Sequence, residues 1–375
     1  MKNQKIFDFA VKMFLFLSPI YFFKEFQLSL VRGLFFVLGS FALFGLSLSL
    51  EPKRKFSNIW ISIFFLLALM RVFLDSSFGN PAAEWFNFWF ACSGFIYVFC
   101  GILLFYVVYC YADDIKGYLK PIVWICILNA ILAVFQAFNI DFMWHNSIFI
   151  SGFMGVSNQL GQYSVMTLPL VWYLHPVLTI FPITTFILAK EISPGVALFV
   201  GLCFLLWYYR KKWAVIALCT VVIAFSIVNH SWILRKWSTR PLVWKKTAQV
   251  ALQRPYLGWG YHSFADKVLN IGETKTIGPL APNRAHNDYL HTAQELGFPI
   301  LIVLGMFFLG LYKRFIFVKN KDRFTVFLAS SVIIVLVNMF GQPVIRSASI
   351  SGTFIILLAL LCIKLEIKHD ENSNM

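Results

Sequence analysis

The feature that most constrains this chain is a series of apolar segments, each long enough to cross a lipid bilayer. A transmembrane helix needs roughly 20 mostly apolar residues, with a range of about 17–25. Strong segments of this kind are residues 28–50, 57–74, 88–110, 119–138, 196–209 with the preceding turn, 213–229, 298–312, 324–341 and 349–365, and residues 9–23 are a weaker one. The sequence therefore predicts a polytopic, all-α membrane protein.

The apolar stretch 159–189 is too long for a single span. His175-Pro176 interrupts it near the middle, and a proline ends or kinks a helix because it has no backbone N–H to donate. We therefore predict two short spans in this stretch, which brings the total to about twelve.

The composition excludes a soluble enzyme, a disordered chain and a disulfide scaffold. Hydrophobic residues make up 59% of the 375 residues and charged residues only 13%, whereas a typical soluble domain is about 25% charged. All seven cysteines lie in apolar runs without metal-ligand spacing, so we expect them to be small buried hydrophobic side chains. The first apolar stretch, 6–23, contains Asp8 and Lys12 and is not a typical signal peptide.

Basic residues concentrate in alternate connections between the predicted spans. The clusters are Lys53-Arg54-Lys55, Arg210-Lys211-Lys212, and Lys313-Arg314 followed by Lys319, Lys321 and Arg323. Because short cytoplasmic loops carry an excess of Lys and Arg, these connections and both termini are predicted to be cytoplasmic. The long connection 230–297 then lies on the outer side of the membrane.

The long outer connection is more basic than orientation requires. Its nine basic residues are Arg235, Lys236, Arg240, Lys245, Lys246, Arg254, Lys267, Lys275 and Arg284, against four acidic ones, Asp266, Glu273, Asp288 and Glu295. This excess predicts an anionic partner outside the cytoplasm. The chain thus divides into a first set of transmembrane helices (residues 1–229), the large loop (230–297), and the last transmembrane helices with a cytoplasmic tail (298–375).

Local motifs follow one another along the large loop. A helical pattern begins at Arg240, with Pro241 suited to its first turn. A turn rich in glycine and aromatic residues follows at 254–261, and then a stretch with Gly272, Gly278, Pro279 and Pro282. Asn287 is a predicted helix N-cap and Gly297 a predicted helix stop.

This order of pieces resembles the O-antigen ligase and polymerase superfamily, membrane glycosyltransferases that move lipid-linked glycans and carry a Wzy-C-type loop. The matching motifs are Arg240 with Trp244, the Pro-x-x-Gly-x-Gly turn Pro255–Gly260, His286-Asn287 with Leu290, and Glu295 with Gly297. The Gly- and Asn-rich stretch 152–161 also looks like the family's entry to a mid-chain span.

The resemblance implies a GT-C-like fold and a glycosyl transfer reaction. The donor would be a glycan on a polyprenyl pyrophosphate such as undecaprenyl pyrophosphate. The acceptor would be a hydroxyl of a lipid- or glycan-borne molecule, such as the lipid A-core of lipopolysaccharide, at the outer face of the bacterial inner membrane. The reaction would be inverting and would need no metal or other cofactor. Membrane lipids would surround the chain, and no nucleic acid partner is expected.

The resemblance also implies roles for individual residues. His286 would act as the general base on the acceptor hydroxyl, work that suits an imidazole with a pKa of about 6.5. Arg240 would bind the pyrophosphate and stabilise its developing charge. Arg254 and Arg284 are weaker candidates for phosphate contacts, and Asn287 and Glu295 would support the site.

The chain departs from the family pattern at one position. Family members often have Ser-Arg-Gly where this chain has Ser193-Pro194-Gly195. Lys190 could supply the missing charge from the same membrane face, although lysine lacks the bidentate fork of arginine. Arg346, predicted to face outward, is a further candidate.

The alternatives are a metal site, a polymerase, a transporter and a membrane scaffold. Asp288, His291 and Glu295 share a helix face with His286, but His-x4-His is not a recognised zinc spacing, and no metal site is predicted. A polymerase of the same superfamily stays open, although the Arg-x10-Gly signature of some polymerases is absent. A transporter would need ionisable groups near the bilayer midplane and often inverted repeats. Here the charged residues within the predicted spans, such as Lys12, Arg32 and Arg71, fall mostly towards the ends of the spans, and no inverted repeat is visible. A membrane scaffold would leave the basic loop unexplained.

Overall fold

The computed structural model describes residues 2–19, 28–56, 59–75, 81–140, 150–154, 156–228, 231, 240–264, 267–268, 284–318 and 321–373, and every regular element among them is helical. The α-helices are α1 (Lys2–Leu17), α2 (Leu28–Ser47), α3 (Ile59–Asp75), α4 (Pro81–Tyr111), α5 (Leu119–Ala137), α6 (Ser157–Leu174), α7 (Ile180–Ala189), α8 (Ile192–Tyr208), α9 (Lys212–Val228), α11 (Arg240–Gln253), α12 (Asp288–Leu296), α13 (Phe298–Phe317), α14 (Arg323–Asn338) and α15 (Ala348–Ser373). The two short 3₁₀ helices among the described residues are η1 (Gly152–Met154) and η2 (Pro176–Thr179).

The helices coincide with the apolar segments of the sequence. The predicted interruption at His175-Pro176 is confirmed: α6 ends at Leu174, His175 is extended (φ −149°), and Pro176 begins η2. Two N-terminal boundaries were predicted too late, because α1 begins at Lys2 and α4 at Pro81. Residues 20–23 of the weak first segment, and 232–239, 265–266 and 269–283 of the large loop, lie outside the described residues.

Among the described helices, four contain a stretch long and apolar enough to cross a membrane. These stretches are Gly94–Tyr111, Leu119–Ala137, Phe298–Phe317 and Ile350–Ile367. Shorter apolar stretches are Gly33–Ser47, Ile59–Met70, Pro176–Ala189, Ile192–Tyr208, Lys212–Ile223 and Arg323–Asn338. An all-helical fold with these apolar helices is that of a membrane protein.

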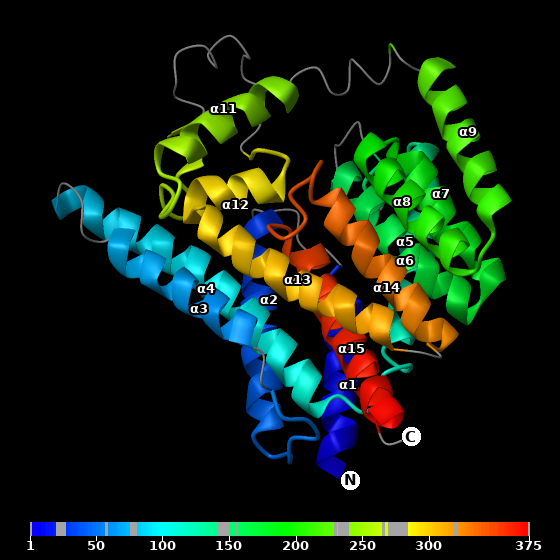
Figure 1. The fold of residues 1–375 in the computed structure, drawn as a ribbon, viewed down its shortest axis with the longest axis horizontal. Helices are drawn as coiled ribbons and strands as arrows, with labels where there is room; N and C mark the ends of the chain where they lie inside the picture. The colour runs from blue at the N-terminus through cyan, green and yellow to red at the C-terminus, as the bar shows by residue number, and fades with distance from the viewer. Residues whose placement is uncertain are drawn as a thin grey trace.

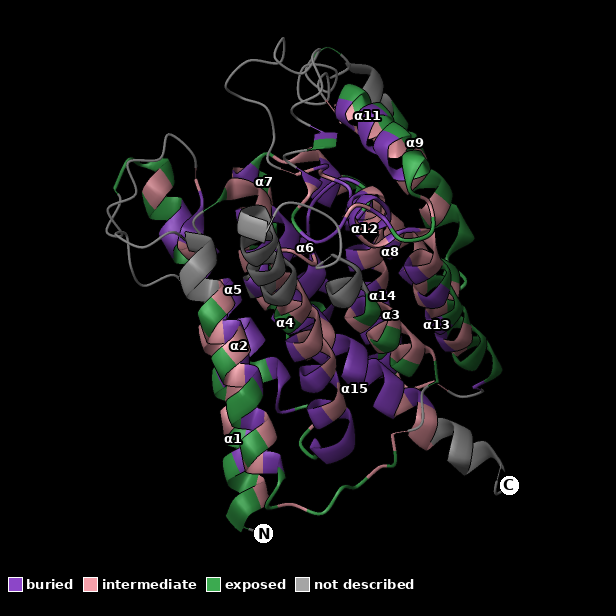
Figure 2. Ribbon diagram, turned by 90° about the vertical axis from the view of Figure 1, so that its left-hand side faces the viewer, coloured by how far each residue is buried: buried purple, intermediate pink, exposed green. Residues whose placement is uncertain are grey.

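Helix α15 forms the centre of the bundle. Of its apolar stretch Ile350–Ile367, 78% is buried, against 22% of Phe298–Phe317 in α13. It packs against α2, α4, α13 and α14, and α14 packs in turn against α6 and α8. Figure 2 shows the buried residues concentrated on α15 and the inner faces of its neighbours, with exposed residues on outward faces such as that of α1. The outer faces are those that hydrocarbon would cover.

The two ends of the bundle carry different parts of the chain. The N- and C-termini lie at one end, and α11 lies at the opposite end in both views (Figures 1 and 2). Helix α11 packs against α12, and α12 leads through Gly297 into α13. The described parts of the large loop are therefore joined to the bundle at the end away from the termini.

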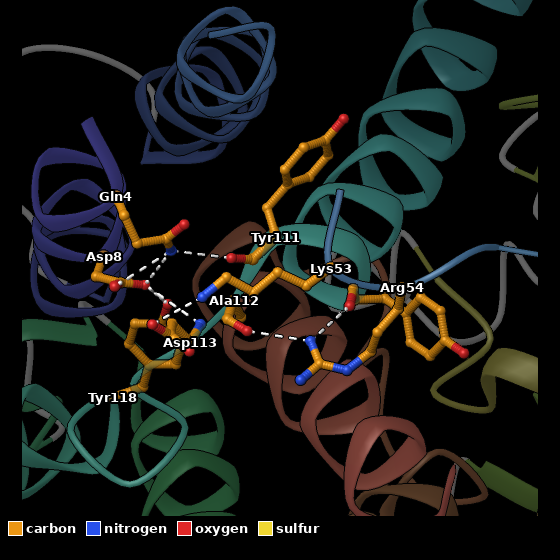
Figure 3. Close-up of polar contacts among 9 residues, drawn as sticks. Gln4, Asp8, Lys53, Arg54, Tyr111, Ala112, Asp113 and Tyr118 are labelled. Carbon is orange, nitrogen blue, oxygen red and sulfur yellow. Dashed lines mark hydrogen bonds and ion pairs between the residues drawn. The ribbon is translucent and has the colours of Figure 1, made fainter. Parts of the chain in front are cut away.

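Polar side chains tie the segments at the terminal end together (Figure 3). Gln4 of α1 donates from Nε2 to the backbone oxygen of Tyr111 at 3.0 Å. The Tyr118 hydroxyl donates to Asp8, and Lys53 forms an ion pair with Asp113 at 2.7 Å. Part of the basic cluster at 53–55 thus also has a structural function, because it joins the α2–α3 connection to the α4–α5 connection.

Candidate functional site

The described end of the large loop is built on a capped helix. Asn287 is the N-cap of α12, and its Oδ1 accepts a hydrogen bond from the backbone N–H of Leu290 at 3.0 Å. Gly297 ends the helix with φ 84°, a conformation that favours glycine. The N-cap and the helix stop predicted at these two residues are both confirmed.

Two glycines interlock the turn Pro255–Gly260 with the end of α12. Gly258 has φ 65°, and a Cβ there would lie 2.4 Å from the backbone oxygen of Glu295. A Cβ on Gly297 would lie 2.4 Å from the backbone oxygen of Tyr256. The backbone N–H of Trp259 donates to Gln294 and that of Phe298 to Pro255, at 2.8 and 2.7 Å. The turn is thereby fixed to the start of α13.

His286 lies just before α12, in contact with the segment that follows α14. Its Nδ1 is 3.2 Å from Oε1 of Gln342, and Nδ2 of Asn158 donates to the same oxygen at 3.3 Å. The backbone beside His286 is held by Trp244, whose Nε1 donates to the oxygen of Ala285 at 2.9 Å. The family-like Trp244 on α11 therefore positions the residue next to the candidate base.

The contact with Gln342 determines which imidazole nitrogen is available. An amide oxygen can only accept, so the proton of the neutral ring is on Nδ1 and the lone pair on Nε2 is left for a substrate. Burial lowers the pKa of His286, the hydrogen bond to Gln342 opposes this shift, and the charges of Arg240 and Arg284 lower it further. His286 is therefore neutral at pH 7, which is the form that a general base requires.

Arg240, the first residue of α11, contacts the residue next to Gln342. Its Nη1 donates to the backbone oxygen of Gly341 at 2.6 Å. A Cβ on Gly341 would lie 2.2 Å from Oγ of Ser193 and 3.6 Å from Nη1 of Arg240. Only a glycine at position 341 leaves room for Ser193 to lie so close. This approach brings the start of α8, where Ser193 lies, beside Arg240.

Ser193 links the departure from the family motif to the site. Its Oγ donates to Oδ1 of Asn338 at 2.9 Å. Burial lowers the pKa of Arg240 and the carboxylate of Glu191 opposes that shift; the guanidinium stays charged, because its ordinary pKa is above about 12. The Ser193-Pro194-Gly195 segment is thus near Arg240, although it lacks the family's arginine.

A second group, here called the Glu295 network, consists of Glu295, His291, Asp288 and Arg346. Arg346 Nη2 lies 2.9 Å from Glu295 Oε2, and His291 Nε2 lies 3.2 Å from Glu295 Oε1. The backbone N–H of His262 donates to Glu295 at 2.9 Å. Burial would raise the pKa of Glu295, but Arg346 and His291 hold it well below its usual value. Glu295 is therefore ionised and connects the glycine-rich turn, α12 and the segment after α14.

Asp288 is the other buried carboxylate of the Glu295 network. Its Oδ2 accepts a hydrogen bond from the backbone N–H of Ile345 at 2.8 Å. Its Oδ1 is 3.8 Å from Nε of Arg346, which is too long for a hydrogen bond. Burial raises the pKa of Asp288 to about 6, although the charge of Arg346 opposes this. Among the described residues, no three His, Cys, Asp or Glu side chains are grouped so as to hold a metal ion.

Arg284 brings a further positive charge to the same region. Its Nη1 donates to the backbone oxygen of Arg346 at 3.3 Å, and the pKa of Arg284 is lowered by burial and by the neighbouring charge of Arg346. Two neighbouring guanidinium groups repel each other, and an anionic ligand relieves that repulsion. Arg284 and Arg240 also both act on the pKa of His286.

The other two basic candidates occupy different positions. The Arg254 guanidinium lies over the ring of Trp259, 4.2 Å from its centroid, and the side chain is exposed. Lys190 is the C-cap of α7, with φ 52°, and its side chain is also exposed. The described contacts therefore bring Arg240, Arg284 and His286 together, but they do not include Arg254 or Lys190.

The sequence interpretation missed Gln342 and Gly341 and gave Asn158 and Ser193 no role of their own. All four lie at or near the ends of helices. The run Gly341-Gln342-Pro343 directly after a predicted span was the available signal. It was weak because polar residues at helix ends are common.

A comparison with known protein families finds a match over part of the chain. Residues 177–305 match the O-antigen ligase family, a range that includes α7 to α9, the whole large loop and the start of α13. A comparison with curated proteins finds none that matches the chain. The matched family implies a glycosyl-transferring membrane enzyme that acts on lipid-linked glycans. The match covers about a third of the chain, and over these residues the chain is similar to the O-antigen ligase family.

Proposed function

We propose that this protein is an O-antigen ligase-like glycosyltransferase. It takes a glycan from a polyprenyl pyrophosphate carrier and joins it to a hydroxyl of an acceptor such as a lipid A-core, at the outer face of the bacterial inner membrane. The observation that carries the proposal is that a neutral histidine and an arginine held by a hydrogen bond contact two consecutive residues of the chain. His286 contacts Gln342, and Arg240 contacts Gly341.

The proposed reaction is a single displacement. Nε2 of His286 accepts the proton of the acceptor hydroxyl while the oxygen attacks the anomeric carbon of the donor sugar. The bond between that carbon and the pyrophosphate oxygen breaks, so the configuration inverts and the polyprenyl pyrophosphate leaves. Arg240 and Arg284 stabilise the charge that develops on the leaving oxygen, and the reaction needs no metal.

The remaining predicted residues take supporting roles in this proposal. Asn287 caps the helix behind His286, and Glu295 holds Arg346 beside Arg284. Lys190 and Arg254 are exposed and could contact the donor as it enters. Lys190 would bind phosphate as a point charge, without the bidentate fork of an arginine.

The proposed topology has about twelve transmembrane helices, which is the number the apolar segments allow. Residues 1–229 hold the first set, the loop 230–297 is extracytoplasmic, and 298–375 hold the last helices and the tail. Both termini are cytoplasmic. The separation of the termini from α11 along the bundle (Figure 1) supports this arrangement.

The product that accumulates in a deletion strain tests ligase against polymerase. Loss of a ligase leaves long glycan chains on the carrier lipid, and complementation with the intact gene returns them to the acceptor. Loss of a polymerase instead leaves single repeat units attached to the acceptor. Chain lengths on extracted carrier lipid and acceptor decide between the two, and unchanged glycans in both fractions would contradict the proposal as a whole.

The pH dependence of transfer tests the contact with Gln342. Because the pKa of His286 is lowered, the base form persists below pH 6.5, and transfer is lost only as the pH falls through the lowered pKa. In Gln342→Glu the new carboxylate favours the imidazolium, so we expect the acid limb to move up by about one pH unit. Purified enzyme assayed from acid to neutral pH measures both limbs. Asn158→Asp serves as the comparison: Asn158 contacts Gln342 and not His286, so we expect a smaller shift of the acid limb. If the acid limbs of Gln342→Glu and the unaltered protein superimposed, the contact would have no role in setting the pKa of His286.

A further inference from the structure

A cavity of about 740 Å³ opens between α6, α8, α9 and α14. None of its lining residues belongs to the group around His286 or to the Glu295 network. Its volume is within the range of roughly 300–1,000 Å³ that is common for ligand sites. The lining is hydrophobic or aromatic apart from two cations, Lys211 and Arg323.

One face of α9 lines the cavity. Ala214, Ala217, Leu218 and Val221 all contribute to it, and their spacing of three, four and seven residues places them on one helix face. Helix α9 packs against α8, yet Ala214, Ala217 and Val221 stay exposed. In a bilayer, an apolar stripe that lines a cavity is covered by hydrocarbon.

The two cations lie at helix ends that meet at the cavity. Lys211 is in the connection between α8 and α9, and Arg323 is the first residue of α14. None of the lining residues is acidic. The carboxylate next to Arg323 is engaged elsewhere, because Asp322 pairs with Lys364 at 3.0 Å and caps the backbone N–H of Thr325 at 2.9 Å. The polar end of the cavity is therefore positively charged.

We propose that this cavity binds an anionic phospholipid. One acyl chain lies along the stripe 214–221 of α9, and the headgroup phosphate lies between Lys211 and Arg323. Basic pockets between transmembrane helices are known to hold acidic headgroups in this manner. The proposal rests on the chain being embedded in a membrane and does not depend on the proposed glycan transfer.

The charged end of the cavity distinguishes this lipid from the glycan donor. Lys211 and Arg323 belong to two of the basic clusters that predict cytoplasmic connections. Arg240 and His286 lie in the large loop, which is predicted to be on the opposite side. A phosphate held by Lys211 and Arg323 therefore belongs to the cytoplasmic leaflet, whereas the donor pyrophosphate is used in the outer one.

Native mass spectrometry of the full-length protein in detergent tests the charge requirement. The protein is titrated with phosphatidylglycerol or with phosphatidylcholine of the same acyl chains. We expect retention of phosphatidylglycerol over phosphatidylcholine, and at least about tenfold weaker phosphatidylglycerol binding in the double variant Lys211→Gln/Arg323→Gln. The matched control Lys120→Gln/Lys313→Gln removes two exposed lysines outside the cavity and should bind phosphatidylglycerol as the unaltered protein does.

Filling the cavity tests the position of the acyl chain. Ala217→Phe puts a large side chain into it without entering the packed core, because Ala217 is exposed, and it should weaken binding of both lipids. Equal retention of the two lipids by the unaltered protein overturns the proposal, as does an equal loss in the control double variant. A dimer that Ala217→Phe dissociates with lipid binding unchanged would assign the cavity to a second copy of the chain and also overturn it.

Discussion

Replacing His286 by alanine is expected to reduce glycan transfer by a factor of roughly 10²–10⁴, the usual contribution of a general base. The loss should appear in kcat, because the imidazole acts on the acceptor hydroxyl during the reaction and not on binding of the carrier lipid. Transfer from a lipid-linked donor to acceptor by the purified variant measures it. Abundance in the membrane should stay unchanged, since His286 is only partly buried.

The backbone at His286 makes a second variant necessary. Its φ of 49° is left-handed, and alanine adopts this conformation less readily than asparagine does. His286→Asn keeps the backbone but removes the base, so it should lose as much transfer as the alanine variant. His262→Asn is the matched control, because His262 is an exposed loop histidine with φ 60°. If His286→Asn retained full transfer, the histidine could not be the base.

Arg240→Ala should lower kcat by about 10²–10³, the range found when one preorganised donor to a developing negative charge is removed. The kcat of Arg240→Lys should lie between those of Arg240→Ala and the unaltered protein, because lysine keeps the charge but not the planar fork. Steady-state kinetics with varied donor separates the expected loss in kcat from a rise in KM. A pure KM effect in Arg240→Ala would mean that the arginine holds donor and transition state equally and is not part of the chemistry.

Lys245→Gln is the appropriate control for the arginine variants. Lys245 is exposed on α11, so its replacement removes one positive charge from the same helix without touching Gly341. We expect its kinetics to match those of the unaltered protein. An equal fall in Lys245→Gln and Arg240→Ala would indicate a general effect of loop charge and would exclude a specific role for Arg240.

Features set by neighbouring residues were predictable from the sequence. Asn287 caps α12 and Gly297 ends it, because both effects need only the backbone of the same helix. The end of α6 before Pro176 follows from the missing proline N–H in the same way. The apolar segments likewise predicted where helices lie, although α1 and α4 begin earlier than predicted. Among the described helices, four contain a stretch long and apolar enough to cross a membrane.

Features that depend on distant segments were not predictable. Gln342 meets Asn158 across 184 positions of sequence, and no local pattern pairs a residue after α14 with one at the start of α6. The same holds for Arg346 and Glu295, which come from different segments and form a buried pair. The sequence also gave equal weight to Arg254 and Arg284, whereas the contact of Arg254 with Trp259 separates it from Arg284. Helix packing decides these partners, and a single sequence does not reveal it.

The reciprocal fit of Gly258 and Gly297 has a consequence for engineering acceptor or glycan preference. Each glycine leaves no space for a side chain opposite the other's segment, so the turn and the α12–α13 corner fit only as a pair. A chimera that exchanges the loop with that of a relative should therefore carry residues 240–298 as one block. A chimera joined between the turn and Gly297 would take the two packed segments from different proteins, so they would not fit each other. It should misplace His286 even with every catalytic residue present.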